Sequence, residues 1–240
     1  MRNRVSKSIA KPQSAKPTTS TTAVKTAVAK TSATTAVRQP ADDSAVPALI
    51  KQLRTGDFAA RLSAATALKQ LRDRQTASAL AAALRDQAAE VAREAAEALG
   101  ALKDRSALDA LKAVVLNADG YYDSTVRAAA AESLAHLQDQ RAVDVLIAGV
   151  RDPIAETSRA AIRALGQLGD ERAVDSLAAV VRNSDNYFLP ATRAVALEVL
   201  GRFHTPAARE SLRSIAADPF IDPSIRQTAS ASLALAISGN

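Results

Sequence analysis

Apolar residues recur at three- and four-residue steps through most of the chain, which is the spacing of amphipathic helices. The segments AVDVLIAGV (142–150), REAAEALGAL (93–102) and RAAIRALGQL (159–168) show this pattern. No window alternates strictly between apolar and polar residues, as a half-buried strand would. The pattern therefore predicts an all-α protein.

The helical pattern is itself repeated six times. A helix-capping residue with leucine seven positions later occurs at Asp42–Leu49, Asp73–Leu80, Asp104–Leu111, Asp139–Leu146, Asp170–Leu177 and Thr205–Leu212. A second column of leucines contains Leu68, Leu99, Leu134, Leu165, Leu200 and Leu233. We expect six units at about 42–72, 73–103, 104–138, 139–169, 170–204 and 205–237, within a repeat domain that spans 42–240.

Each unit reads as a helical hairpin. The first helix is predicted to begin at the Asp or Thr, whose side chain can accept from free N–H groups of the first turn. A turn rich in Asp, Asn, Gly or Pro follows, and then a second, alanine-rich helix runs to the leucine of the second column. One hairpin cannot bury its apolar face alone, whereas stacked hairpins can. The repeats therefore predict an α-solenoid.

Two segments carry a specific resemblance. LGDERAVDSLAAVV (168–181) and SRAAIRALGQLGDERAV (158–174) resemble the bacterial HEAT-like repeats, including those grouped with phycobilin lyases. The resemblance covers residues 42–237. It implies a right-handed α-solenoid of six HEAT-like hairpins whose second helices line the concave side.

The resemblance also implies a ladder of hydrogen bonds between a turn Asp and an Arg early in the second helix. The matching residues are Asp57, Asp86, Asp119, Asp152, Asp185 and Asp218, with Arg61, Arg127, Arg193 and Arg226. Ala92 and Ser158 occupy the arginine position in units two and four, and Arg93 and Arg159 follow one residue later. Because one residue rotates a helical side chain by about 100°, we expect these two arginines to face outward.

Six of the seven aromatic residues fall in the turns within the hairpins. Units three and five are 35 residues long, and their extra residues surround the pairs Tyr121–Tyr122 and Tyr187–Phe188. Phe58 and Phe220 fall in the corresponding turns of units one and six. Two interpretations stay open: the rings cover the hairpin cores, or they anchor a partner. We expect at most one ring of each pair to be fully buried.

Charges of both signs alternate along the predicted concave face, at Glu90, Arg93, Glu97, Glu132, His136, Arg159, Arg163, Gln167, Glu198 and Arg202. This mixture is typical of a solvated face or a polar protein-binding groove, and not of a uniformly basic nucleic-acid cleft. The candidates for partner binding are Tyr121, Tyr122, Tyr187, Phe188, Phe220, Arg93, Glu97, Glu132, His136, Arg159, Arg163, Glu198 and Arg202.

The net charge of +6 is unevenly divided. Residues 1–41 hold eight basic residues and no acidic one, which leaves 23 basic against 25 acidic residues in the remainder. This segment of Lys, Ser, Thr, Ala, Val and Pro has no aromatic residue and no leucine, so we expect it to be disordered. A tether, a polyanion-binding or nucleic-acid-binding tail, and an organellar transit peptide are the three interpretations left open.

Candidate chemistry is scarce. The chain has no cysteine, which excludes disulfides, thiol catalysis and Cys-ligated metals. The two histidines, His136 and His204, lie in different units, and no catalytic motif surrounds them. We expect no catalytic residue, cofactor or metal. Without an apolar run of about 18 residues or a secretory leader, we expect a cytoplasmic protein that does not contact membranes.

Three functions follow from these features. The first is a non-enzymatic scaffold or adaptor that binds protein through the concave face and the aromatic turns. The alternatives are a nucleic-acid-associated protein with its affinity in the basic tail, and an accessory subunit or chaperone of the phycobilin-lyase type. The last helix, 223–237, carries a single charge, and we expect its outer side to contact another subunit, a partner or the tail.

Overall fold

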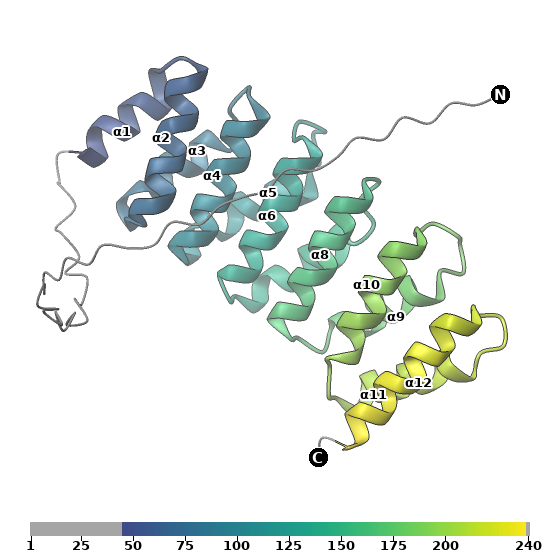
Figure 1. Ribbon diagram of the computed structural model, residues 1–240. Helices are drawn as coiled ribbons and strands as arrows, with labels where there is room; N and C mark the ends of the chain where they lie inside the picture. The colour runs from purple at the N-terminus through teal and green to yellow at the C-terminus, as the bar shows by residue number, and fades with distance from the viewer. Residues whose placement is uncertain (1–44, 239–240) are drawn as a thin grey trace, which may run out of the picture. The chain divides into compact units, whose positions relative to one another are not determined.

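The computed structural model describes residues 45–238 (Figure 1). The described residues belong to one unit of the chain, Pro40–Asn240. The predicted basic tail and the first predicted cap, Asp42, lie outside the described residues.

The described part of the chain folds into twelve α-helices and contains no strand. They pair in chain order: α1 (Ala45–Thr55) with α2 (Phe58–Leu71), α3 (Ala77–Ala83) with α4 (Ala89–Leu102), α5 (Leu108–Leu116) with α6 (Ser124–His136), α7 (Val143–Gly149) with α8 (Ala155–Leu168), α9 (Ala173–Arg182) with α10 (Pro190–Gly201), and α11 (Pro206–Ala217) with α12 (Pro223–Ser238). The prediction of an all-α solenoid of six hairpins is confirmed.

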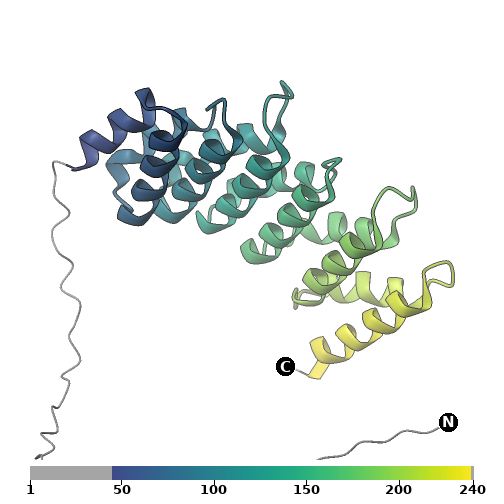
Figure 2. The same ribbon diagram turned by 45° about the horizontal axis from the view of Figure 1, so that its top comes forward.

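The hairpins stack in a single file of two layers (Figure 1). Consecutive second helices, from α2 to α12, pack against one another and form one layer. The first helices, from α1 to α11, form the other layer (Figure 1). The stack bends, with the second helices on its inner side (Figure 2). We call the exposed surface of the second helices the second-helix face.

The core runs along the stack between the two layers. Most leucines of the two predicted columns lie in it: Leu80, Leu111, Leu146, Leu177 and Leu212 from first helices, and Leu68, Leu99, Leu134, Leu165 and Leu200 from second helices. All ten are fully buried. The two end members, Leu49 and Leu233, are only partly buried and pack against the core. Helices pack both within a hairpin and between neighbouring hairpins, so the core is continuous along the stack.

The joints between hairpins differ from the prediction in one respect. Asp73, Asp104 and Asp139 cap short 3₁₀ turns, not α-helices, and each carboxylate accepts the backbone N–H two residues on at 2.9–3.0 Å. The α-helices α3, α5 and α7 begin about one turn later. The tight 3₁₀ turn satisfies the first N–H groups while the chain crosses from one layer to the other. Thr205 caps α11 directly, as predicted.

No helix of residues 45–238 has the length and apolar character needed to cross a membrane.

Candidate functional site: the second-helix face and the turn edge

The turns that join the two helices of each hairpin lie along one edge of the stack (Figure 1). We call this the turn edge; it consists of residues 56–57, 84–88, 117–123, 150–154, 183–189 and 218–222 with the helix residues beside them. Two of the turns, 117–123 and 183–189, are longer and contain the aromatic pairs.

In each aromatic pair one ring is buried and the other is exposed. Tyr122 and Phe188 are 8% exposed, whereas Tyr121 is 45% and Tyr187 is 43% exposed. The rings of each pair meet edge to face, with centroids 5.2 Å and 4.9 Å apart. The first members of the pairs are therefore on the surface, and the second members cover the hairpin cores.

Contacts among four groups hold Tyr121 against the preceding hairpin, and we call this set of contacts the staple. The groups are the Tyr121 side chain, the carbonyl and the guanidinium of Arg85, and the Asp119 carboxylate. The Tyr121 hydroxyl donates to the carbonyl of Arg85 at 2.8 Å, and the Arg85 guanidinium lies 4.7 Å from the centre of the Tyr121 ring. Arg85 in turn donates to Asp119 at 2.9 Å. This hydrogen bond holds the pKa of Asp119 below its usual value.

The same staple recurs two hairpins later. The Tyr187 hydroxyl donates to the carbonyl of Arg151 at 2.8 Å, Arg151 lies 4.8 Å from the ring centre, and Arg151 donates to Asp185 at 2.5 Å. That bond likewise lowers the pKa of Asp185. The structural unit that repeats along this edge is thus a pair of hairpins, one with a short turn and one with a long turn.

Two Asp–Arg rungs form where a continuous ladder was predicted. Arg61 donates to both carboxylate oxygens of Asp86, at 2.7 and 3.0 Å. Arg127 donates to both oxygens of Asp152, at 2.7 and 2.8 Å, and also to the carbonyl of Tyr122. The bond with Asp152 raises the pKa of Arg127.

The remaining ladder positions do not form rungs, and the prediction is wrong for them. Asp57 and Asp218 accept backbone N–H groups, Asp119 and Asp185 bind Arg85 and Arg151, Arg193 donates to the carbonyl of Val181, and Nε of Arg226 is buried without a partner among the described residues. A rung forms where the Asp stands three residues before the second helix, as Asp86 and Asp152 do. Asp119, Asp185 and Asp218 stand five residues before theirs and therefore lie away from the ladder position.

The second-helix face carries ion pairs within its own layer. Lys69 lies 2.7 Å from Glu94 and 2.8 Å from Glu97, and Arg93 also pairs with both glutamates. Glu156 pairs with Arg159 and Arg163, and Glu198 pairs with Arg202. Arg93 and Arg159 thus lie on this face, outside the rungs. Mixed charge persists along the whole face.

A charged hollow of about 460 Å³ lies between α2, α4 and α6. It is lined by Lys69, Arg72, Glu97, Lys103, Glu132 and His136. Glu132 and His136 are exposed and have no ion-pair partner within residues 45–238. This hollow brings together three of the predicted partner-binding residues, Glu97, Glu132 and His136.

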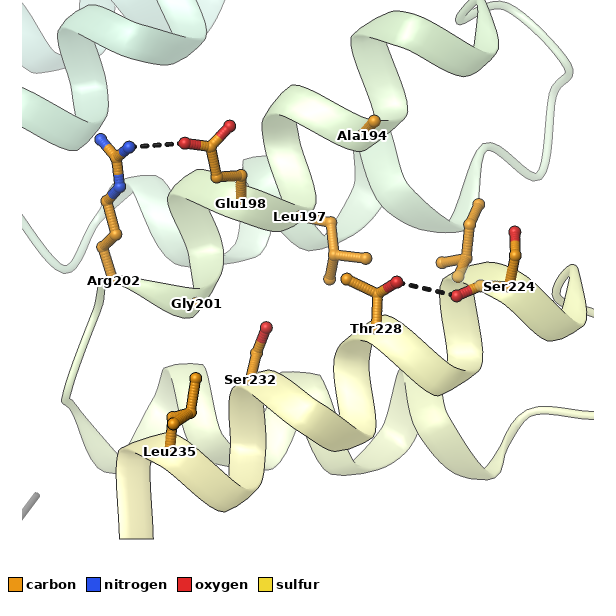
Figure 3. Close-up of a pocket in the computed structure, with 10 residues that line it drawn as sticks. Ala194, Leu197, Glu198, Gly201, Arg202, Ser224, Thr228, Ser232 and Leu235 are labelled. Carbon is orange, nitrogen blue, oxygen red and sulfur yellow. Dashed lines mark hydrogen bonds and ion pairs between the residues drawn. The ribbon is translucent and has the colours of Figure 1, made fainter. Parts of the chain in front are cut away.

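An apolar hollow of about 410 Å³ lies at the other end of the same face, between α10 and α12 (Figure 3). Leu197, Ile225 and Leu235 line it, and Leu235 is 75% exposed. The Glu198–Arg202 ion pair lies at its rim (Figure 3). Glu198 and Arg202 were predicted for this face, but the hollow was not. It forms where the small Gly201 lies opposite α12, and these two features of the sequence, the glycine and the weakly charged last helix, are the signal that could have indicated it.

The predicted candidates thus occupy two surfaces. Tyr121, Tyr187 and the 96% exposed Phe220 lie on the turn edge, and the charged candidates lie on the second-helix face. Tyr122 and Phe188 are enclosed and cannot contact a partner directly. Within residues 45–238, no group of three or more His, Asp or Glu side chains is arranged to hold a metal ion.

Comparison with known proteins agrees with this architecture. A family model for HEAT repeats matches residues 46–122 and 122–189. No curated protein matches the chain. Among solved structures, a chain of the CpcE–CpcF complex of phycocyanin lyase from Nostoc sp. PCC7120 has a TM-score of 0.54 at 23% identity, over 86% of this chain and 80% of that one.

Two further structures are similar. An engineered protein has a TM-score of 0.52 at 21% identity, over 82% of this chain and 98% of that one. Human deoxyhypusine hydroxylase has a TM-score of 0.40 at 21% identity, over 81% and 85%. At these identities, the likenesses to the phycocyanin lyase chain and to the engineered protein show a shared fold. The family model matches more than half of this chain, and six hairpins stack in single file. The chain therefore belongs to the HEAT-repeat family.

Proposed function

We propose that this HEAT-repeat chain is a scaffold that binds a protein partner on its second-helix face. The observation that carries the proposal is the apolar hollow between α10 and α12, which is open to solvent and bordered by the Glu198–Arg202 pair. An apolar centre with a charged border is the composition of a protein–protein interface. The hollow, of about 410 Å³, is large enough to accept apolar side chains of a partner.

The charged hollow supports the same role. Its lysine, arginine, glutamate and histidine side chains can bind either sign of charge, which suits a polar protein surface. Phosphate backbones require a uniformly basic surface, and Glu97 and Glu132 would repel them here. The two hollows together supply an apolar anchor at one end and charge selection at the other.

The test uses two matched substitutions and a partner identified by affinity capture with the full chain. Ala194→Arg places a long cationic side chain in the apolar hollow, and Ala113→Arg makes the same change on the exposed side of α5. We expect Ala194→Arg to lower the affinity for the purified partner about tenfold or more, as at an interface hot spot. Ala113→Arg should leave this affinity unchanged. Equal affinities for both variants, at equal stability, would refute the proposal.

A further inference from the structure

We propose that the turn edge is a second docking surface, which binds an extended, basic segment of a partner protein. A Lys or Arg side chain of that segment enters a hollow beside Tyr121, and an apolar side chain packs on Tyr187 and Leu189. The inference deepens the proposed protein-binding role, and rests on it, by naming the chemistry of the bound segment.

Exposed apolar side chains concentrate on this edge. Among the described residues, the exposed large apolar side chains of the turn edge are Phe58, Leu116, Tyr121, Ile154, Tyr187, Leu189 and Phe220. Within the part of the chain whose burial is described, only Leu235 of this class lies elsewhere. Scattered single residues of this kind need no explanation, but a row of seven along one edge indicates an interaction surface.

The two exposed tyrosines are held in place before any partner binds. The hydroxyl bond to Arg85 or Arg151 fixes each ring at its outer end, and the stacked guanidinium fixes one ring face. A side chain that is already ordered loses little conformational entropy on binding. These tyrosines are therefore efficient anchors, although their hydroxyl groups are already engaged.

The hollow beside Tyr121 has the shape and charge for a long basic side chain. It measures about 270 Å³, and its apolar lining residues are Leu84, Ala89, Ala92, Tyr122 and Val126, with Gln87, Asp86 and Asp123 as its polar ones. The Asp86 carboxylate is already bound to Arg61, so Asp123 is the carboxylate that offers itself to a ligand. The exposed Asp123 carboxylate accepts from the N–H and hydroxyl of Thr125, and no cation lies within ion-pair distance of it among residues 45–238. A Lys or Arg can bury its methylene stem in the hollow and keep its charged end at Asp123.

The equivalent position two hairpins later has an apolar residue in place of the aspartate. Leu189 stands 66 residues after Asp123 and Thr192 stands 66 residues after Val126. Beside the exposed Tyr187 ring, the exposed Leu189 therefore offers an apolar contact where the first position offers a carboxylate. The two positions select different side chains, so the bound segment should lie along the edge in one chain orientation.

The separation of the two positions sets the spacing in the bound segment. Packed helices lie about 8–10 Å apart, so positions two hairpins apart are about 16–20 Å from one another. An extended chain advances about 3.3 Å per residue. The basic and apolar side chains should therefore be about five or six residues apart.

A random linear peptide library displayed on phage and selected on the full chain tests this directly. We expect selected peptides to share a Lys or Arg and an aliphatic or aromatic residue at about this spacing. Asp123→Asn and Tyr187→Ala should each lower the affinity for a synthetic copy of the selected peptide about tenfold. Asp175→Asn, at an exposed aspartate of α9, is the control and should change nothing. Replacing the peptide's Lys or Arg with Gln should abolish the effect of Asp123→Asn.

Other outcomes overturn the inference without touching the proposed function. The selected peptides could bind Asp123→Asn and Tyr187→Ala with unchanged affinity but bind Ala194→Arg more weakly. That result would assign peptide binding to the second-helix face alone. Failure to select any peptide, while a captured partner still responds to Ala194→Arg, would reject the turn edge. Loss of the Ala194→Arg effect on the partner, with edge-dependent peptides intact, would instead reject the second-helix face.

Discussion

At the residue scale, the rung between Arg127 and Asp152 is the most enclosed ion pair of the described structure. Their side chains are 9% and 7% exposed, and Arg127 uses its remaining nitrogen on the carbonyl of Tyr122. The rung joins the third hairpin to the fourth. Because both charges are shielded from water, each depends on the other for stabilisation.

Arg127→Ala should therefore lower the free energy of unfolding by about 3 kcal/mol or more, since it leaves the Asp152 carboxylate enclosed and unpaired. Arg193→Ala, which removes only hydrogen bonds to the carbonyl of Val181, should have a smaller effect. Urea titration of both variants measures the difference. An Arg127→Ala loss below about 1 kcal/mol would show that water already reaches this pair.

Asp139, in the joint between hairpins three and four, provides a dependence on pH. The hydrogen bond from Arg141 lowers its pKa from 3.8 to about 2. A carboxyl group with a depressed folded-state pKa stabilises the fold above its unfolded pKa and loses that contribution as the pH falls through the folded value. The contribution is on the order of 1–2 kcal/mol, because the exposed Arg141 leaves the pair partly screened.

We expect Asp139→Asn to be less stable than the unmodified chain at pH 7, and the gap should close between about pH 4 and pH 2. Chemical denaturation of both proteins across this range measures the gap. A gap that persists unchanged at pH 2 would mean that the Asp139 charge is not its origin.

At the element scale, close approach of second helices depends on small residues. A Cβ at Gly100 of α4 would lie 2.8 Å from Cβ and 2.9 Å from Cα of Ser133 in α6. Ser133 cannot rotate away freely, because its hydroxyl donates to the carbonyl of Ala96 at 2.8 Å. The alternative is a shift of one helix against the other.

Gly100→Ala should consequently destabilise the protein by about 1–2 kcal/mol, although alanine favours helix formation. Gly201→Ala is the matched comparison, since its Cβ would meet only the Ser232 side chain at 3.0–3.1 Å and should be better tolerated. Thermal unfolding of the two variants gives the ranking. A Gly100→Ala protein more stable than the unmodified chain would contradict the contact.

The hairpins and both leucine columns could be predicted, because helix periodicity and repeat register are local properties of the sequence. Which ring of each aromatic pair is buried could not, because the outcome depends on the neighbouring hairpin that supplies Arg85 or Arg151. The prediction of a continuous Asp–Arg ladder was wrong for a related reason. Asp86 and Asp119 occupy similar local sequence, but turns of different length direct their side chains to different partners.

At the scale of the whole molecule, positive charge and folded repeats are separate in the sequence. Residues 1–41 hold eight basic and no acidic residues, the remainder has 23 basic against 25 acidic, and the second-helix face is mixed. We expect the full chain to bind heparin with a strong salt dependence, and a chain that begins at residue 42 to lose this binding. Elution from a heparin column under a salt gradient compares them. Unchanged elution after the deletion would locate polyanion binding in the repeats.

A protein partner bound as we propose would cover the second-helix face. Amine-reactive labelling of lysines, read by mass spectrometry with and without the captured partner, measures this most directly. Lys69 and Lys103 line the charged hollow, whereas Lys51 lies on α1 and Lys112 on α5, in the other layer. We expect labelling of Lys69 and Lys103 to fall severalfold in the complex while Lys51 and Lys112 react as before. Protection of Lys51 and Lys112 with full reactivity of Lys69 and Lys103 would contradict it.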